Sequence, residues 1–448
     1  MKSRILIFSR ILIYLIFFVL VGCYYQLTIN YLFFSPPKPT NFTRQVIDYT
    51  KDKLEPKILV GFSKRDITPS RHSWLAGYFP PHLSLDVNDK LWIKSLAFKD
   101  GNGNSFVIVS CDLIGLLPNE KKEIVKLVKT IDENAIFITT THTHSGPDTI
   151  GYWGVPPFSG RDEKYIKFLR IQIAEVIDES VNNLKSGHVR FSKTILLNYT
   201  VGTENNDPDK TVSVIQAFLN SGKPVTLVNF AAHPNVIKSY SISADYIYYL
   251  EQKLNKLTGG ETMFVAGAIG GVNPKNFNQN FARDFGEVLA DKVYHSLSNS
   301  VTSNKIFIKR KDLKVTIPLE NKRFIKALKV GMIPDFRKRE KINLTFNYKG
   351  KLIPLSEGGY VEMHFSKISM GPIEIITAPG EVFPNIWTEV KPYMGGEINM
   401  LFGLTNGELG YFLKKEDFIS GKHEYHVDMS IGKTAGYAAR KVMLLLVK

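Results

Sequence analysis

Cysteine is scarce in this chain: its 448 residues contain only Cys23 and Cys111, which lie in very different contexts. A disulfide framework is therefore not what holds the fold together. Several functional motifs are also missing, namely Gly-x-Ser-x-Gly, Gly-x-x-x-x-Gly-Lys, His-Glu-x-x-His and Cys-x-x-Cys. Their absence argues against a serine hydrolase, a P-loop nucleotide enzyme and a zinc ribbon.

Blocks of Lys and Arg interleaved with aromatic residues are absent too, so we expect no nucleic-acid partner. The chain is nevertheless basic, because 57 Lys and Arg against 42 Asp and Glu give a formal net charge of +15. This charge is spread along the sequence, which favours solvated lysine faces and some attraction to anionic lipid headgroups. With 44% hydrophobic, 12% aromatic and 22% charged residues, the composition is typical of a globular protein and excludes disordered, collagen-like and polytopic membrane chains.

The N-terminus has the pattern of an export signal or membrane anchor. No charged residue occurs from Ile11 to Phe34, and basic residues precede this run, so we expect the rest of the chain on the exported side, periplasmic or extracellular. Two outcomes stay open: an uncleaved transmembrane anchor, or lipoprotein cleavage that leaves Cys23 acylated. Either outcome attaches the protein to a membrane surface. The expected division of the chain is a signal anchor or lipoprotein signal over 1–34, a linker over 35–57 and a hydrolase domain over 58–448.

The remainder alternates strand-like and helical patterns. Residues 105–110 (SFVIVS) and 135–143 (AIFITTTHT) are short β-rich apolar runs, and 121–131 between them has helical periodicity, which predicts a β-α-β unit. Residues 213–219 and 225–232 predict a hairpin. The spacing of apolar residues predicts further helices at 245–257 and 281–297. The fold class predicted is α/β, a single large mixed-sheet body with a metal site at its strand ends.

Three histidines are placed where such a site needs them. His142 and His144 lie two residues apart at the end of a predicted strand, so their side chains are expected on the same face. His233 ends a second apolar strand and is followed by Pro. Catalytic zinc commonly takes three protein ligands and leaves one position open. The pattern therefore favours a metal site, although it does not decide which histidine of the pair contacts the metal.

Six stretches carry a resemblance to a known family, and they occur in the family's order and spacing: Gly61-Phe-Ser-Lys-Arg-Asp-Ile-Thr-Pro69, Leu75-Ala-Gly-Tyr78, Ser110-Cys-Asp-Leu113, Thr141-His-Thr-His-Ser-Gly-Pro147, Ala232-His-Pro234 and Ala378-Pro-Gly-Glu381. Together they resemble the catalytic domain of the neutral/alkaline non-lysosomal ceramidases. The resemblance covers residues 58–430, and its most specific part is the His-Thr-His-Ser-Gly-Pro segment. It implies a single zinc ion and hydrolysis of the amide of N-acylsphingosine.

Carried over position by position, the resemblance implies that the zinc ligands are His142, His233, Glu381 and Tyr411. Glu408 lies three residues before Tyr411 and stays open as an alternative to it. His144 is then expected beside the metal, as a group for proton transfer or oxyanion stabilisation.

The chain also departs from the family. A family Gly-Asp-x-Ser-Pro stretch is represented by Gly270-Gly-Val-Asn273-Pro274, so Gly271 stands in place of Asp and Asn273 in place of Ser. A serine-nucleophile mechanism is thereby unsupported, and Asn273 becomes a candidate amide donor to the oxyanion. We also expect a divergent member that lacks the family's C-terminal immunoglobulin-like domain.

These observations predict a membrane-tethered, zinc-dependent amidohydrolase of an N-acylated lipid resembling ceramide, in which zinc activates water and polarises the carbonyl. Asp112 and Asp245 are further candidates, as carboxylates that orient a ligand histidine. Two alternatives remain: a metal-dependent deacylase of a non-lipid substrate, such as an amino sugar or a peptidoglycan amide, and a non-catalytic lipid-binding homologue.

Overall fold

The computed structural model describes residues 45–48, 58–155, 159–204, 206–219, 222–303, 306–321, 345–348, 351–354 and 360–448. Contacts divide the chain into two units, Met1–Asn41 and Phe42–Lys448, and every described residue lies in the second. None of the helices in these ranges is long and apolar enough to cross a membrane. The expected anchor over 1–34 and most of the expected linker lie outside the described residues, and the expected domain boundaries stay predictions.

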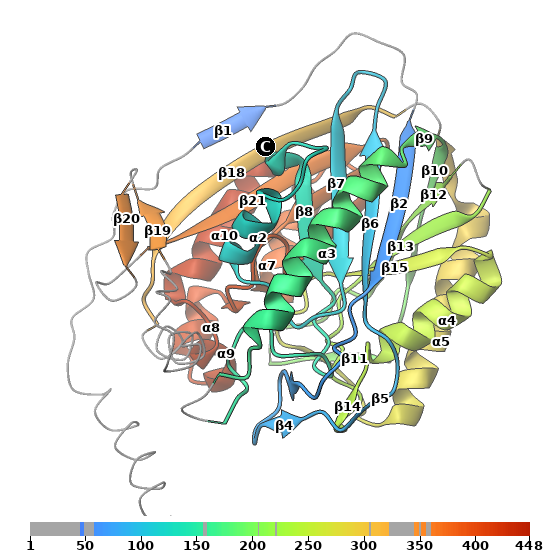
Figure 1. Cartoon of the computed structure of the whole chain (residues 1–448). Helices are drawn as coiled ribbons and strands as arrows, with labels where there is room; N and C mark the ends of the chain where they lie inside the picture. Colours follow the sequence, from blue (N-terminus) through green and yellow to red (C-terminus); the bar gives the residue numbers. More distant parts are fainter. Residues whose placement is uncertain are drawn as a thin grey trace, which may run out of the picture. The chain divides into compact units, whose positions relative to one another are not determined.

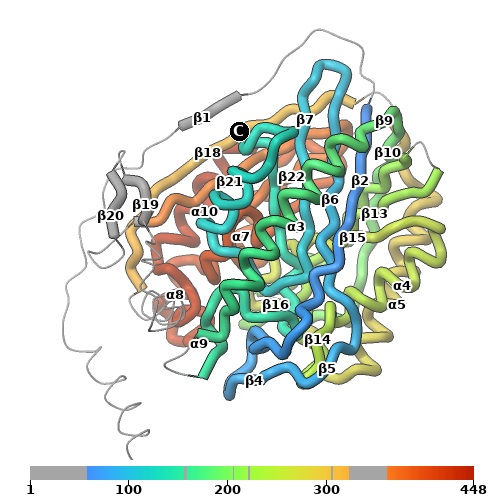
Figure 2. The backbone as a smooth tube through the Cα atoms, viewed as in Figure 1, coloured from blue at the N-terminus to red at the C-terminus, as the bar shows by residue number. Residues whose placement is uncertain are grey.

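In the described part of the second unit, five two-stranded sheets accompany three five-stranded sheets (Figures 1 and 2), where we expected one large mixed sheet. All three contribute to a shared hydrophobic cluster, with Phe106 from the first sheet, Leu227 from the second and Ile375 from the third. The mixed α/β class is confirmed and the single sheet is wrong. The physical reason is that an apolar run identifies a strand, whereas its partner strands are chosen by contacts between segments far apart in the sequence.

The first sheet has the strand order β8-β7-β6-β2-β9 and mixes parallel and antiparallel pairs. Its strands are β2 (Leu59–Asp66), β6 (Trp92–Lys99), β7 (Ser105–Cys111), β8 (Ile136–Thr140) and β9 (Lys185–Ser186). The long helix α3 (Glu163–Asn182) packs on β2 and β6 (Figure 1). Gly61 permits this approach, because a Cβ there would lie 2.0 Å from the carbonyl oxygen of Ser180.

The predicted β-α-β unit is confirmed, since β7 and β8 are parallel and a helix connects them. This helix, α2 (Pro118–Val125), begins and ends earlier than the range 121–131 that periodicity indicated. It begins early because proline is favoured in the first turn of a helix. It ends early because the backbone N–H groups of Lys129 and Thr130 donate to the Asp178 carboxylate on α3 instead of continuing the helix.

The second sheet has the order β15-β13-β12-β10-β17. Its strands are β10 (His188–Ile195), β12 (Thr211–Phe218), β13 (Pro224–Phe230), β15 (Glu261–Ala266) and β17 (Val301–Ser303). The predicted β12–β13 hairpin is confirmed, and β15 adds to it in parallel. The two predicted helices, α4 (Tyr246–Thr258) and α5 (Gln279–Ser296), pack against each other, and α4 also contacts β15.

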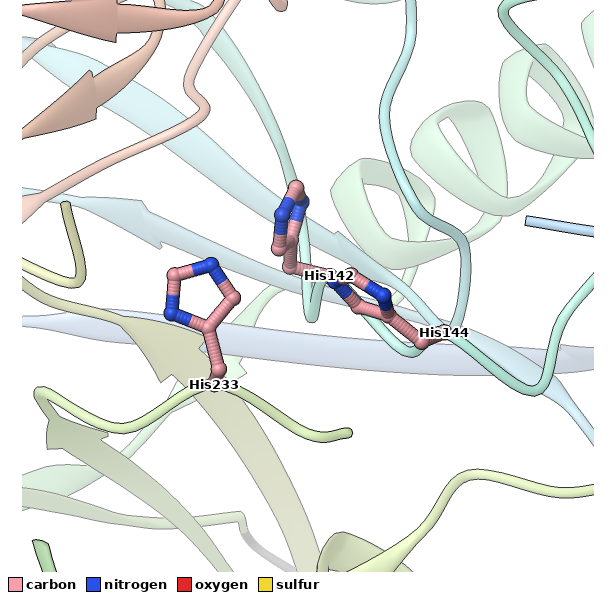
Figure 3. Close-up of side chains that lie close together, drawn as sticks. All are labelled: His142, His144 and His233. Atoms are coloured by element: carbon pink, nitrogen blue, oxygen red, sulfur yellow. The ribbon is translucent and has the colours of Figure 1, made fainter. Parts of the chain in front are cut away.

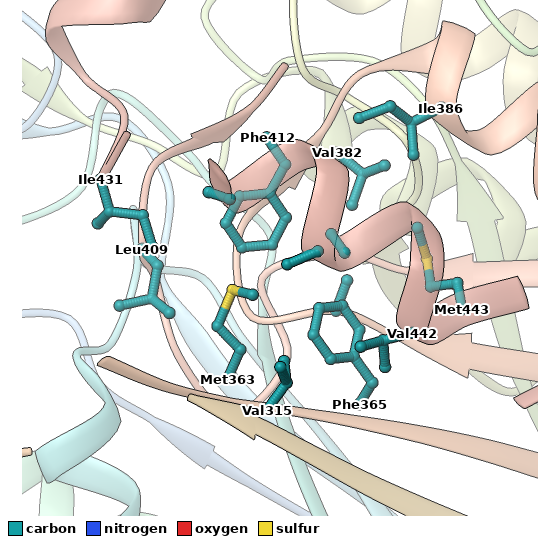
Figure 4. Packing of buried hydrophobic residues seen from close by; sticks show 14 of the residues in the cluster. Val315, Met363, Phe365, Val382, Ile386, Leu409, Phe412, Ile431, Val442 and Met443 are labelled. Atoms are coloured by element: carbon teal, nitrogen blue, oxygen red, sulfur yellow. The ribbon is translucent and has the colours of Figure 1, made fainter. Parts of the chain in front are cut away.

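The third sheet has the order β1-β18-β21-β22-β24. Its strands are β1 (Gln45–Asp48), β18 (Ile308–Pro318), β21 (Tyr360–Met370), β22 (Ile373–Thr377) and β24 (Ile398–Phe402). The helices α7 (Pro384–Val390) and α10 (Lys433–Val447) pack against each other, and α10 also contacts β18 and β21. Figure 4 shows the hydrophobic cluster between them, which includes Val315, Met363, Phe365, Val382, Ile386, Leu409, Phe412, Ile431, Val442 and Met443.

Hydrogen bonds tie the three sheets together near the carboxyl ends of β8, β13 and β24. The Thr139 hydroxyl donates to the Gly403 carbonyl over 3.0 Å, which joins the first sheet to the third. The Asn229 side-chain amide donates to the carbonyl of Leu401 over 2.9 Å and so joins the second sheet to the third. Loops that leave these strand ends are therefore held close together, and the candidate site is built from them.

Candidate metal centre

His142 occupies a loop and not the strand that the sequence indicated. Strand β8 ends at Thr140, and His142 has a φ of +69°, in the left-handed region that histidine seldom adopts. Its N–H donates to the carbonyl of Leu113 and its Nδ1–H to that of Ile114 (2.5 Å). We expected alternation along a strand to put His142 and His144 on the same face, and that reason is wrong because neither residue lies in a strand. Both rings reach the site because the backbone turns sharply at His142.

His144 and His233 are held in the same way, by backbone groups. The N–H of His144 donates to the carbonyl of Pro234, and the His144 Nε2 is buried without a hydrogen-bond partner. The Nδ1–H of His233 donates to the carbonyl of Val272 over 2.8 Å. Figure 3 shows the three imidazoles gathered together, with ring centroids 5.1 to 5.8 Å apart. Burial, reinforced by its histidine neighbours, lowers the pKa of His142 well below its usual value and that of His144 to about 3, so both are neutral at physiological pH.

Glu381 and Tyr411 lie side by side on two short parallel strands. They are direct partners in the pairing of β23 (Glu381–Val382) with β25 (Tyr411–Phe412). Oε2 of Glu381 lies 2.8 Å from Nε2 of His233 and 3.5 Å from Nε2 of His142. The Tyr411 ring lies beside that of His233, with centroids 6.4 Å apart, and Tyr411 lines the same cavity as Glu381. The structure thus brings together all four residues that the resemblance implied as ligands.

Glu408, which the sequence left open as an alternative to Tyr411, is also in the site. It is 5% exposed. One ligand atom from each of His142, Glu381 and Glu408 lies within 4.8 Å of the other two. One oxygen accepts the N–H of Gly410 over 2.7 Å, and the other is buried without a partner. Burial and the neighbouring Glu381 charge raise the pKa of Glu408 well above its usual value.

The chemistry of this donor set fits a divalent cation. Neutral imidazole nitrogens and carboxylate oxygens are common ligands of transition metals and zinc. Within the described part of the chain, neither Glu381 nor Glu408 forms an ion pair with a Lys or Arg. Two buried carboxylates without a compensating charge are costly, and a bound cation removes that cost. A cavity of about 30 Å³ lies against these residues and is lined further by Tyr152, Trp153 and Tyr425.

Asn273 is not among the residues that line this cavity. It lies on β16 (Val272–Pro274), where it pairs with Val201 of β11 (Thr200–Gly202). Its neighbour Val272 makes the contact with His233 instead, through the backbone carbonyl. The departure at Gly271 is built into the fold, because its φ is +70° and a Cβ would lie 2.6 Å from the Thr203 hydroxyl oxygen.

Asp112 and Asp245 do not hydrogen-bond to the histidines, contrary to their expected orienting role. Asp112 accepts the N–H of Trp92, and Asp245 accepts the N–H groups of Ile237 and Tyr246. Burial raises the pKa of Asp112 to about 6 and that of Asp245 to about 7. The orienting acceptors for the rings of His142 and His233 are backbone carbonyls, which no side-chain motif reveals.

Gly77 belongs to the site, although the sequence did not lead us to predict it as a site residue. Its φ is +84°, and a Cβ on it would lie 1.8 Å from Nδ1 of His144. The glycine therefore admits the histidine ring. The Leu75-Ala-Gly-Tyr78 stretch contained a signal for this role, because a glycine in a motif often marks a position where another group packs closely against the backbone.

The fold and the site define a mixed α/β protein with a buried histidine and carboxylate cluster at its strand ends, a candidate metal centre. Solved structures that resemble it include a neutral ceramidase from Pseudomonas aeruginosa, with a TM-score of 0.69 and 16% identity over 88% of this chain and 74% of that one. A ceramidase complexed with C2 matches with a TM-score of 0.67 and 14% identity over 88% of this chain and 75% of that one. No family model and no curated protein matches the chain. The chain therefore has a neutral ceramidase-like fold, and the resemblance in the sequence is confirmed at that level.

A methyl group at Gly77 is expected to displace His144. Gly103→Ala is a matched control, because Gly103 has a φ of +86° and nothing within 4 Å of its Cβ position. We expect the control to lose about 1 kcal/mol of unfolding free energy from backbone strain. Gly77→Ala should lose roughly 1–3 kcal/mol more, because the methyl group overlaps the ring. Urea unfolding of both variants measures the difference, and equal losses would contradict the contact.

The raised pKa of Asp245 predicts a pH dependence of stability. Its folded value of about 7 lies above its ordinary 3.8, so the folded state retains a proton that the unfolded state has released. This stabilisation is complete below about pH 4 and is lost as the pH rises to 7, with a slope near 1.4 kcal/mol per pH unit. Asp245→Asn should show a smaller fall between pH 4 and 7 in urea unfolding. An unchanged slope would show that Asp245 is ionised in the fold.

Proposed function

We propose that this protein is a zinc-dependent amidohydrolase that cleaves the amide bond of an N-acylated lipid resembling ceramide. The observation that carries the proposal is the convergence of His142, His233, Glu381 and Tyr411 in one buried cluster on a neutral ceramidase-like fold. Two imidazoles with oxygen donors are a typical zinc set. When bound, zinc supplies polarisation of the acyl carbonyl and activation of water.

The residues around the cluster have roles that follow from their contacts. Nε2 of His142 and Nε2 of His233 face the Glu381 carboxylate, because backbone carbonyls hold their Nδ1–H groups. His144 is neutral and its buried Nε2 has no partner, so this nitrogen is free to hydrogen-bond to substrate or water in a proton transfer. Tyr411 lies directly opposite Glu381 in the pairing of β23 with β25 and lines the same cavity, so its hydroxyl is the proposed phenolic ligand. Asn273 stays a candidate oxyanion donor that requires a movement of β16.

An exposed apolar rim beside the site favours a lipid over a soluble substrate. We define the apolar rim as Phe79, Leu83, Leu85, Val87 and Tyr240, of which Phe79 is 92% and Leu85 66% exposed. Phe79 lies two residues after Gly77, which packs against His144, and the backbone N–H of Leu85 donates to the carbonyl of Tyr240. A patch of exposed apolar side chains marks an interaction site, and the cavity of about 30 Å³ is too small for an acyl chain. In this proposal the amide enters the cavity and the chains lie along the rim.

A second candidate function is deacylation of a non-lipid substrate such as an amino sugar or a peptidoglycan amide. The observation that favours it is the small cavity, together with the lack of space for a side chain at Gly271. Turnover of soluble N-acyl sugars without turnover of N-acyl lipids would establish this alternative.

The charge-free run from Ile11 to Phe34 supports a further part of the proposal, that the N-terminus tethers the protein to a membrane on its exported side.

Removal of one ligand tests the metal and the activity together. In the full chain in detergent micelles, we expect release of fatty acid from N-acylsphingosine to stop with a chelator and to return with zinc. His142→Ala should lower bound zinc from roughly one per chain to a trace and reduce the rate at least about a hundredfold. His188→Ala, an exposed histidine stacked on Phe218, is the control and should change neither. Activity that survives His142→Ala would overturn the site assignment.

Loss of the rim should weaken binding of aggregated substrate. We expect Phe79→Ser with Leu85→Ser to raise KM for micellar N-acyl lipid about tenfold, because each side chain buries apolar surface against lipid. The kcat/KM for a monomeric short-chain substrate should stay unchanged. Ile195→Ser with Leu197→Ser removes two similarly exposed side chains outside the rim (58% and 52%) and should have no effect. Equal KM values for all three proteins would refute the role of the rim.

A further inference from the structure

The sequence treated Glu408 and Tyr411 as alternatives, but the structure places both beside Glu381. Glu408 is therefore a third acidic or phenolic oxygen donor next to the histidines. Its carboxylate is fully enclosed in protein, and within the described ranges it pairs with no Lys or Arg side chain. Buried carboxylates are normally paired or bound to a metal.

The position of Glu408 is fixed by a strained loop that is anchored to the strand before His142. Asn406 has a φ of +62° and bonds twice to Ile138 of β8, accepting its N–H with the side chain and donating its own N–H to the Ile138 carbonyl over 2.7 Å. Leu404 has a φ of +54°. Non-glycine residues in this region cost energy and gather at functional sites. The loop therefore holds Glu408 at a set distance from His142.

The space for Glu408 is provided by a glycine on the opposite loop. A Cβ at Gly115 would lie 2.8 Å from both Cβ and Cγ of Glu408. Gly115 follows Ile114, whose carbonyl orients the ring of His142. The same turn thus aims the histidine and admits the carboxylate, which brings the unpartnered oxygen of Glu408 to the donors of His142 and Glu381.

We propose that Glu408 is a second carboxylate ligand of the metal, so that the ion is held by His142, His233, Glu381 and Glu408 with Tyr411 beside them. A donor set with two carboxylates suits manganese better than a set with one, since carboxylate oxygens favour harder cations while imidazole suits zinc. The site is therefore expected to accept Mn²⁺ as well as Zn²⁺. This inference concerns metal binding alone and does not depend on which amide the protein hydrolyses.

Metal affinity of Glu408→Gln tests the proposal, because Gln is isosteric and still accepts the Gly410 N–H. Calorimetric titration of the metal-depleted full chain with Mn²⁺, Zn²⁺ and Co²⁺ gives the Kd values. We expect Glu408→Gln to raise the Kd for each ion at least about tenfold, with the larger rise for Mn²⁺. The visible absorption of bound Co²⁺ should change as well, since it reports coordination geometry. Glu362→Gln, which removes the same charge from β21, should leave both unchanged.

A second variant guards against a folding defect. Gly115→Ala leaves the charge in place but presses on Glu408, and it should alter the Co²⁺ spectrum in the same direction with a smaller rise in Kd. Thermal unfolding of the metal-free proteins shows whether each variant is folded. Unchanged Kd values and an unchanged Co²⁺ spectrum in folded Glu408→Gln would overturn the proposal, even if activity falls, because Glu408 would then act on a proton and not on the metal.

Discussion

Two carboxylates and three imidazoles share one buried space, and the rest of the site depends on how their charge is balanced. Glu381 and Glu408 have lost their hydration, and the low polarity of their surroundings strengthens the repulsion between them. The histidines beside them resist protonation, because burial disfavours their charged forms. No basic side chain in the described ranges balances the pair, and the pKa of Glu408 is raised well above its usual value, so without a cation this group retains a proton. A divalent cation bound there would balance both carboxylates in their ionised form.

Backbone geometry, and not a chain of side-chain partners, prepares this site for a cation. His142, Asn406 and Leu404 all have positive φ values, and such strain persists only where the surrounding structure determines it. The surroundings here are the ends of three sheets, joined by hydrogen bonds such as that from Asn229 to Leu401. Carbonyl acceptors such as Ile114 and Val272 then fix which nitrogen of each ring remains free. A rigid scaffold of this kind reduces the reorganisation that metal binding or catalysis requires.

The chain keeps the neutral ceramidase-like fold while altering part of the site's surroundings. Gly271 cannot carry a side chain without displacing Thr203 or Phe383. The aspartate that the ceramidase family has at this position would therefore require these neighbours to move. The apolar rim and the small cavity together favour a substrate whose polar amide is buried and whose apolar part stays near a lipid surface. The proposed chemistry and the proposed membrane setting thus rest on different parts of the molecule.

The sequence by itself predicted the α/β class and the hairpin over 213–232, because apolar periodicity is a local property, and its resemblance to a known family implied His142, His233, Glu381 and Tyr411 as the clustered residues. It did not determine the three-sheet arrangement, which depends on pairings between distant segments. Nor did it show that a left-handed backbone at His142 aims the ring, that Gly77 and Gly115 make room for their neighbours, or that Glu408 joins the cluster instead of replacing Tyr411. Those features arise where loops from separate sheets meet, and only the tertiary structure brings such loops into contact.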